Sequence, residues 1–313
     1  MRRHRDHGGG IDAAVARFGG ERGDWLDLST GINPVPYPIG EIPPEAWTAL
    51  PDAGAQDALV QAARAFWQVP QGAAVLAAPG ASSLIARLPS LWPAGKVRIT
   101  RPTYNEHAAA FEAHGWDVAS TGEADVQVVV HPNNPDGRLW RAGDLSGPVT
   151  VIDESFCDVA PEASHIAKAA DPDVIVLKSF GKFWGLGGLR LGFAIGQPAL
   201  IARLADLIGP WPVAGPALQV GTAALSDLAW AEATRQRLDR EAKLLDYAVT
   251  AKGATVLGGT PLFRLYEVDD ARAWQERLAS QGRVWSRVFP YSDRWLRLGL
   301  PPSGRWDQLE AAL

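Results

Sequence analysis

Between residues 72 and 196, short β-rich runs alternate with helical stretches, and this alternation constrains the fold more than any other feature of the chain. The expected strands are AAVLAA (73–78), KVRIT (96–100), DVQVVV (125–130), PVTVID (148–153), DVIVLKS (173–179) and LGFAIG (191–196). Candidate helices occupy 82–91, 106–114 and 197–207. The alternation is typical of an α/β fold with a mostly parallel sheet and helices on both faces.

The rest of the chain has a different pattern. Residues 216–252 are rich in Ala, Leu, Arg and Glu at helical spacing, and three strand-like runs follow at 262–268, 283–289 and 294–300, with a helical pattern at 271–280. We therefore expect two domains. A large domain spans 46–209, and a smaller α+β domain is formed by 1–45 and 210–313.

Composition excludes several classes of protein. The net charge of −5 and the pI of about 5.7 argue against nucleic acid or an anionic membrane as the main partner. Cys157 is the only cysteine, which excludes an internal disulfide and a cysteine-cluster metal site, and we predict no metal. The apolar runs are too short to span a bilayer, and MRRHRDHGGG lacks the apolar stretch of a secretory signal. A cytoplasmic protein is expected.

Polar residues gather just past the ends of five expected strands, in the sequences GASS, PTYNEH, HPNNPDG, DES and SFGK. Open α/β sheets bind ligands outside the carboxyl ends of their strands. The pattern predicts one crevice lined by these loops, which favours an enzyme site.

Several of these residues have both a structural and a chemical interpretation. Asp153 ends the apolar run VTVI, where it either caps the next helix or faces a cation such as a pyridinium nitrogen. Asn134 lies in a turn-forming sequence but could present its amide to a ligand hydroxyl. Tyr104 could stack on a planar ring or simply pack. The loop Gly80, Ala81 and Ser82 enters a helix and suits a phosphate.

The stretch LKSFGKFWGLGGLRLGF (177–193) places two lysines and an arginine among five glycines. Lys178 lies within the expected strand, whereas Lys182 lies in the loop beyond it, where an amine can reach a ligand. Arg190 can return as a phosphate clamp beside Ser179. An amine, a buried carboxylate, a phosphate cradle and an aromatic ring together indicate a site for pyridoxal 5′-phosphate. A dinucleotide fingerprint does not fit, because these glycines precede the strand and lack the G-x-G-x-x-G spacing.

The string SFGKFWGLGGLRLGF, preceded by NNPDG and DESF, resembles the lysine region of fold-type I, aspartate-aminotransferase-like enzymes that use pyridoxal phosphate. The resemblance implies that Lys182 is the Schiff-base lysine and that Asp153 pairs with the pyridine nitrogen. The other cofactor contacts implied are Asn134 with the ring hydroxyl, Tyr104 stacked on the ring, and Ser179, Arg190 and Gly80–Ser82 around the phosphate.

The opening sequences HGGGIDAA and WLDLSTGINP are similar to the start of the branch that contains threonine-phosphate decarboxylases of cobalamin biosynthesis and histidinol-phosphate aminotransferases. Phe156 stands where many aminotransferases carry a tyrosine, and the decarboxylase branch tolerates phenylalanine there. The resemblance implies decarboxylation of L-threonine O-3-phosphate to (R)-1-aminopropan-2-yl phosphate. Alternatives are an aminotransferase of the histidinol-phosphate type and a catalytically silent binding partner that keeps the fold.

The resemblance also implies a substrate-binding set. Arg297 would bind the substrate carboxylate and Arg287 the substrate phosphate. The amino-terminal loop around His7, Gly8 and Asn33 would close over the ligand. The alternative for each arginine is an ordinary ion pair at the protein surface.

The family further implies a homodimer. The sequence departs from the usual pattern of this family at two places. Gly181 replaces a frequent serine, and residues 51–59 lack the tyrosine lent across the dimer, for which Gln56 is the candidate substitute.

Overall fold

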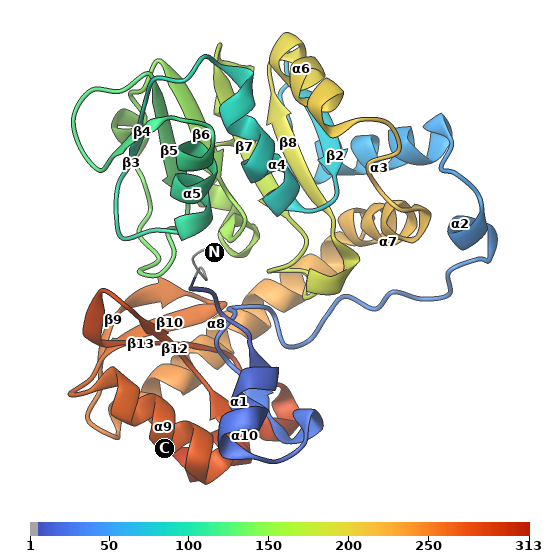
Figure 1. Cartoon of the computed structure of the whole chain (residues 1–313). Coiled ribbons are helices and arrows are strands. Elements are labelled where there is room, and N and C mark those ends of the chain that lie inside the picture. The colour runs from blue at the N-terminus through green and yellow to red at the C-terminus, as the bar shows by residue number, and fades with distance from the viewer. Residues whose placement is uncertain (1–5) are drawn as a thin grey trace. The chain divides into compact units, whose positions relative to one another are not determined.

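A computed structural model describes residues 6–313 (Figure 1). The chain divides into two compact units. The large unit comprises Pro36–Asn134 and Arg138–Ala233, and the small unit comprises residues up to Val35, Pro135–Gly137 and Thr234–Leu313. Within residues 6–313, no helix is both long and apolar enough to cross a membrane.

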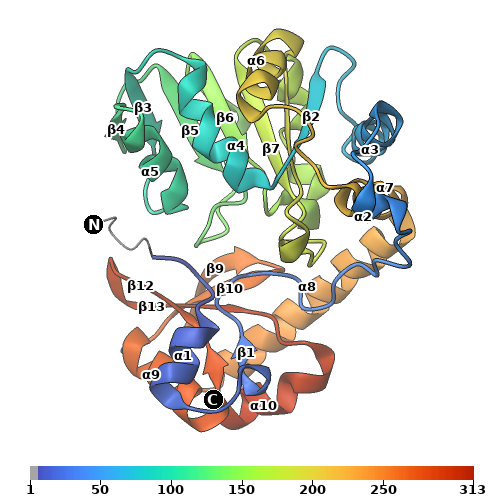
Figure 2. The ribbon, with the colours of Figure 1, turned by 45° about the vertical axis from the view of Figure 1, so that its right-hand side comes forward.

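The large unit contains a seven-stranded sheet in the order β2-β8-β7-β6-β5-β3-β4. Its strands are labelled in Figure 1, and Figure 2 shows the sheet from another side. Its strands are β2 (Ala74–Ala78), β3 (Lys96–Ile99), β4 (Asp117–Ala119), β5 (Val126–Val130), β6 (Val149–Asp153), β7 (Val174–Ser179) and β8 (Gly192–Gly196). β8 is antiparallel to both of its neighbours, and the other pairs are parallel. The predicted α/β class and mostly parallel sheet are confirmed.

Helices cover this sheet because its central strands are apolar on both faces. Every residue of β5 and β8 is buried. One core cluster joins the strands to α4 (Ala81–Arg87), α5 (Asn105–Ala113) and α6 (Pro198–Ile208), through residues such as Leu84, Phe111 and Leu204. The unit also contains α2 (Glu45–Thr48), α3 (Ala53–Phe66) and α7 (Gly215–Ser226), and α7 packs against α3.

The small unit has a four-stranded antiparallel sheet in the order β12-β13-β10-β9 and a two-stranded pair, β1-β11. Its strands are β1 (Leu26–Asp27), β9 (Thr255–Thr260), β10 (Phe263–Glu267), β11 (Val284–Trp285), β12 (Arg287–Phe289) and β13 (Ser292–Gly299). Its helices are α1 (Ile11–Phe18), α9 (Ala271–Gly282), α10 (Trp306–Ala312) and most of α8 (Leu228–Thr250).

The structure corrects two expectations and refines a third. The single strand expected at 283–289 is two strands in different sheets, separated at the buried Ser286. The long helical region expected at 216–252 is helical but is divided at Asp227 into two helices, α7 and α8. The units are also bounded at Val35 and within α8, not at 45 and 209, because α7 packs against α3 in the large unit.

Candidate active site

The carboxyl ends of β2, β3, β5, β6 and β7 lie at one edge of the sheet. These five strands run in the same direction, since β8 is antiparallel to both β2 and β7. For the same reason the segment entering β8 starts at that edge. The five polar loops and Arg190 therefore belong to one edge, as the sequence predicts.

Asp153 ends β6 at this edge and is 2% exposed. Its Oδ1 accepts hydrogen bonds from the Ser155 amide at 3.0 Å and the Ser155 hydroxyl at 2.5 Å, and its Oδ2 lies 2.8 Å from His107 Nε2. Burial raises the pKa of Asp153, but the contacts with His107 and Ser155 outweigh burial and leave the pKa below its ordinary value. A buried carboxylate that stays ionised is suited to face a cation.

His107 is a site residue that the sequence reasoning missed. It stands in the first turn of α5 and is fully buried. Its Nδ1 has no hydrogen-bond partner among the described residues, while its Nε2 bonds Asp153. The available signal was its position in PTYNEH, three residues after Tyr104 and so on the same side of the helix. The centroids of the Tyr104 and His107 rings lie 6.1 Å apart, and the rings are T-shaped at an interplanar angle of 83°.

Lys178 is excluded as the reactive amine by its surroundings. It is 2% exposed, and its Nζ lies 2.6 Å from Glu154 Oε2 and 3.6 Å from Asp158 Oδ1. Burial lowers the pKa of Lys178, but the two carboxylates outweigh burial and raise it above the ordinary value. An amine that stays protonated and paired cannot act as a nucleophile.

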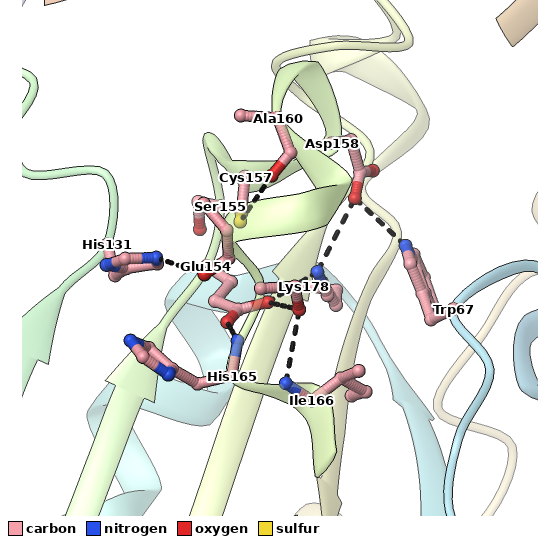
Figure 3. Close-up of polar contacts among 12 residues, drawn as sticks. Trp67, His131, Glu154, Ser155, Cys157, Asp158, Ala160, His165, Ile166 and Lys178 are labelled. Atoms are coloured by element: carbon pink, nitrogen blue, oxygen red, sulfur yellow. Dashed lines mark hydrogen bonds and ion pairs between the residues drawn. The ribbon is translucent and has the colours of Figure 1, made fainter. Parts of the chain in front are cut away.

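The groups around Lys178 form a satisfied buried network (Figure 3). Glu154 also accepts hydrogen bonds from the Ser164 hydroxyl and the His165 amide, each at 2.6 Å. Asp158 accepts hydrogen bonds from two indoles, Trp67 at 2.9 Å and Trp184 at 3.2 Å. This network, which we call the rear network (Trp67, Glu154, Asp158, Ser164, His165, Lys178 and Trp184), ties β6 to β7 from the side opposite Asp153.

Lys182 lies beyond the end of β7 in a half-buried position. Its Nζ is 5.0 Å from the centre of the Phe156 ring. The loop that carries it is anchored by buried aromatic rings, since Trp184 stacks on Phe180 at 5.1 Å and on Trp230 at 5.4 Å. The amine thus lies on a loop that buried aromatic rings anchor and outside the rear network. Its position beyond the end of the strand is the one that the sequence predicts.

A phosphate cradle can be built from the start of α4 and the segment before β8. Gly80 has φ +83°, and a Cβ there would lie 2.6 Å from the Arg190 guanidinium. Arg190 donates to the Gly187 carbonyl at 3.0 Å, and the Ser179 hydroxyl accepts from the Gly181 amide at 3.2 Å. A Cβ at Gly181 would meet only ordinary contacts of 3.5 Å, so the missing serine leaves space without distorting the loop.

Asn134 and Tyr104 lie at the same edge. Asn134 is half-buried in the turn after β5, which its neighbour Asn133 ties to the loop before α5 through Thr103 at 2.6 Å and the Pro102 carbonyl at 3.0 Å. Tyr104 is half-buried and precedes α5. The cofactor contacts of both residues stay predictions.

Three buried side chains could suggest a metal site, because ligand atoms of His131, Glu154 and Cys157 lie within 4.8 Å of one another. Their chemistry argues against it. His131 accepts from the Trp140 amide at 3.1 Å and donates to the Ala163 carbonyl at 2.8 Å, so both ring nitrogens are engaged. Burial raises the pKa of the Cys157 thiol, which keeps it protonated.

The small unit holds the five residues expected to bind substrate, namely His7, Gly8, Asn33, Arg287 and Arg297. The guanidinium of Arg287 is paired with the Asp6 carboxylate: it donates to Asp6 Oδ1 at 2.7 Å and to Oδ2 at 2.6 Å. Arg297 is 4% exposed and donates to the Ser29 carbonyl. Burial, and then the charge of Arg287, lower the pKa of Arg297 to about 9.

Asn33 and Gly8 have structural roles in the small unit. Asn33 Oδ1 accepts from the Val35 amide at 3.0 Å and from Arg237 at 2.6 Å. A Cβ at Gly8 would lie 2.4 Å from the Ser29 carbonyl oxygen, so glycine is required by close packing. His7 is exposed. Substrate binding by these residues stays a prediction.

The large-unit residues fit pyridoxal 5′-phosphate. Three features have the chemistry that this cofactor needs: an ionised buried carboxylate, a half-buried amine over a phenylalanine, and a glycine–arginine cradle that a Cβ would fill. They would suit a pyridine partner, a covalent anchor and a phosphate site.

Comparison with known proteins gives the same answer. The aminotransferase class I and II family matches residues 44–313. The chain is 41% identical to a threonine-phosphate decarboxylase from Sinorhizobium sp., covering 96% of this chain and 95% of the relative. It is 37% identical to a threonine-phosphate decarboxylase from Pseudomonas aeruginosa, covering 98% and 97%. The structure of a Sinorhizobium meliloti histidinol-phosphate aminotransferase in complex with pyridoxal-5′-phosphate superposes with a TM-score of 0.85 at 20% identity, covering 97% and 93%.

The chain therefore belongs to the aminotransferase class I and II family. It is a pyridoxal-phosphate-dependent enzyme with the aspartate-aminotransferase-like fold, which confirms the predicted fold, cofactor and enzyme class.

Proposed function

We propose that this enzyme decarboxylates L-threonine O-3-phosphate to (R)-1-aminopropan-2-yl phosphate in cobalamin biosynthesis. The observation that carries the proposal is its near full-length likeness to two threonine-phosphate decarboxylases, at 41% and 37% identity. The buried Phe156 at 4% exposure is consistent with this branch. Transamination of the histidinol-phosphate type remains the weaker alternative.

The roles of the large-unit residues follow from their chemistry. Pyridoxal phosphate, when bound, accepts the electron pair left at Cα by the broken bond. Lys182 would bind the cofactor covalently and later donate a proton to Cα. Asp153, held ionised by His107 and Ser155, would oppose the positive charge of the pyridine nitrogen. Gly80, Ala81, Ser82, Ser179 and Arg190 would hold the phosphate, Asn134 the ring hydroxyl, and Tyr104 and Phe156 the ring.

Two arginines of the small unit suit a substrate with two anionic groups. Arg297, buried and with a lowered pKa, would gain stability in its charged form from a bound carboxylate. Arg287 would take the phosphate, since its fork matches two oxygens of one group. By fixing both anions, the arginines would select which Cα bond breaks.

The deciding experiment supplies O-phospho-L-threonine to the holoenzyme and follows carbon dioxide release. In parallel, amino transfer to 2-oxoglutarate is measured. We expect carbon dioxide without stoichiometric glutamate. Glutamate formation at the rate of substrate loss, without carbon dioxide, would instead establish an aminotransferase.

We also propose a cytoplasmic homodimer. A mostly apolar groove of about 600 Å³ is formed by α2, α3 and α7. Leu50, 66% exposed, lines it, and Trp47, 68% exposed, follows the lining residue Ala46 in α2. Large exposed apolar side chains around a groove favour burial against a protein partner, and Gln56 on α3 is the candidate cross-subunit contact. Trp47→Glu is expected to shift the sedimenting species toward monomer, whereas an unchanged dimer would place the interface elsewhere. A cytoplasmic location suits a charged substrate that does not cross a bilayer unaided.

A further inference from the structure

The segment Asp6–Gly10, which we call the N-terminal strap, is fastened to the small unit along its length. The Gly9 amide donates to the Ser29 hydroxyl at 2.6 Å, and the Gly9 carbonyl accepts from the Trp285 indole at 2.9 Å. Gly9 and Gly10 have φ values of +86° and +84°, which favour glycine. The HGGG sequence thus shapes a strap whose first described residue is Asp6.

Asp6 makes the strap's strongest polar contact. Its carboxylate meets the Arg287 guanidinium fork to fork at 2.7 and 2.6 Å, and Arg287 also donates to the His7 carbonyl at 2.6 Å. The Arg287 side chain is 12% exposed, so this pair is partly withdrawn from solvent, where charge-assisted bidentate bonds are strong. Asp6 therefore occupies the Nη1–Nη2 edge of the guanidinium, an edge that could otherwise bind two oxygens of a phosphate.

Arg287, Arg297 and Asp6 share one electrostatic neighbourhood. Arg287 lowers the pKa of Arg297. Burial raises the pKa of Tyr291 to about 12; Asp6 and Asp136 add to that rise, while Arg287 and Arg297 oppose it. Ser29 connects the parts, because its carbonyl accepts from Arg297 and its hydroxyl accepts from the strap. In this setting Asp6 is the carboxylate that pairs with Arg287, whereas Tyr291 and Asp27 favour the charged form of Arg297.

We propose that Asp6 is an internal competitor for the phosphate of substrate and product: it pairs with Arg287 when no ligand is bound, and the ligand phosphate displaces it. This inference rests on the proposed function and assigns a role to a residue outside the expected site. A phosphate dianion carries more charge and more acceptor oxygens than a carboxylate, so the exchange favours the ligand. No bond other than hydrogen bonds and ion pairs is made or broken.

The competitor matters most after decarboxylation. The product keeps the phosphate but has lost the carboxylate, so it no longer has an anion for Arg297. Return of the tethered Asp6 to Arg287, at the high effective concentration of an attached group, then favours product release.

The test uses the holoenzyme and two ligands that differ only in phosphate. These are 1-aminopropan-2-yl phosphate and 1-aminopropan-2-ol, titrated by the change in cofactor absorbance. Asp6→Asn is expected to tighten the phosphorylated ligand by roughly ten- to hundredfold, the equivalent of one hydrogen-bonded charged pair, and to leave the alcohol unchanged. Asp12→Asn is the matched control, because it removes the same charge from another ion pair of the small unit, with Arg22.

Two further variants keep the test decisive. If Asp6→Asn folds poorly, Asp6→Ala takes its place and should bind the phosphorylated ligand more tightly than the wild type does. In an Arg287→Gln background, neither Asp6 variant should change the affinity for the phosphorylated ligand. Unchanged or weaker phosphate binding in both Asp6 variants, or equal tightening of the alcohol, would overturn the inference. Because binding is read without turnover, failure here is distinct from failure to decarboxylate O-phospho-L-threonine.

Discussion

The two faces of the β6–β7 edge use similar residues for opposite purposes. On the rear face, Lys178 is 2% exposed and paired with Glu154 and Asp158, whose remaining acceptors are bound by Ser164, His165 and two indoles. On the opposite face, where we propose that the cofactor binds and which we call the cofactor face, Asp153 is held ionised. There His107 Nδ1 has no hydrogen-bond partner among the described residues.

Adjacent residues of an extended chain point to opposite faces. The side chains of Asp153 and Glu154 therefore lie on opposite faces, and so do those of Lys178 and Ser179. The comparison teaches that a satisfied ionic network stabilises geometry, whereas chemistry requires charge that is left to meet a ligand. The rear network fixes the ends of β6 and β7, and the cofactor face uses the positions so fixed.

The largest expected effect comes from the cofactor face. Lys182→Ala would remove the proposed covalent anchor and proton donor, so we expect kcat to fall by on the order of 10³-fold or more. The fold should be retained, with a nearly unchanged free energy of unfolding. Lys168→Ala, at a partly exposed lysine of the same unit that pairs with Asp171, is the control and should keep full activity. Normal turnover by the Lys182→Ala enzyme would contradict the proposal that Lys182 is the reactive amine.

The matching change on the rear face is Lys178→Met. It leaves Glu154 and Asp158 buried without their cation, so the free energy of unfolding should fall by roughly 3–5 kcal/mol. Denaturant unfolding of the apoenzyme measures this. Adding Glu154→Gln should restore part of the loss, because the pair is coupled. If stability is unchanged while cofactor binding is lost, Lys178 belongs to the cofactor face after all.

His107→Phe sharpens the comparison through pH. Loss of the hydrogen bond to Asp153 should lower kcat/KM by roughly ten- to hundredfold. In the wild type, the depressed pKa of Asp153 contributes stability that is present above the ordinary carboxyl pKa and is lost as the pH falls through the lower folded value. Without His107 that pKa rises, so the acid limb of the activity profile should move to higher pH. His114→Phe, at the exposed end of the same helix, should leave the profile in place.

The smallest expected effect is at the cradle. Gly80→Ala places a Cβ 2.6 Å from the Arg190 guanidinium in a backbone conformation with φ +83°. The strain should be roughly 1–2 kcal/mol and should weaken cofactor affinity in equilibrium dialysis. Gly143→Ala, where a Cβ meets nothing within 4 Å, is the control. Equal cofactor affinity in both variants would remove Gly80 from the phosphate site.

Much of the large unit could be predicted because its strands are continuous apolar runs bounded by turns. The choice of Lys182 over Lys178 also followed from position, since a residue inside a buried strand is held away from the ligand edge. β9 was missed because TVLGGT carries two glycines and little β signal, and β11 and β12 were merged because RVWSRVF shows no break.

Other features depend on contacts that no local pattern encodes. His107 gains its meaning only when α5 is packed so that Nε2 reaches Asp153, a residue 46 positions away. The Asp6–Arg287 pair joins residues 281 positions apart. The antiparallel direction of β8, which brings Arg190 close to Gly80, is likewise a property of the assembled sheet.

The central claim is that the two lysines, four residues apart, have separate roles. Borohydride reduction of the holoenzyme, followed by peptide mapping, tests it directly, because reduction fixes the cofactor to the amine that holds it. We predict the label on Lys182 and none on Lys178. Label on Lys178, or no labelled lysine in an enzyme that releases carbon dioxide from O-phospho-L-threonine, would contradict the account.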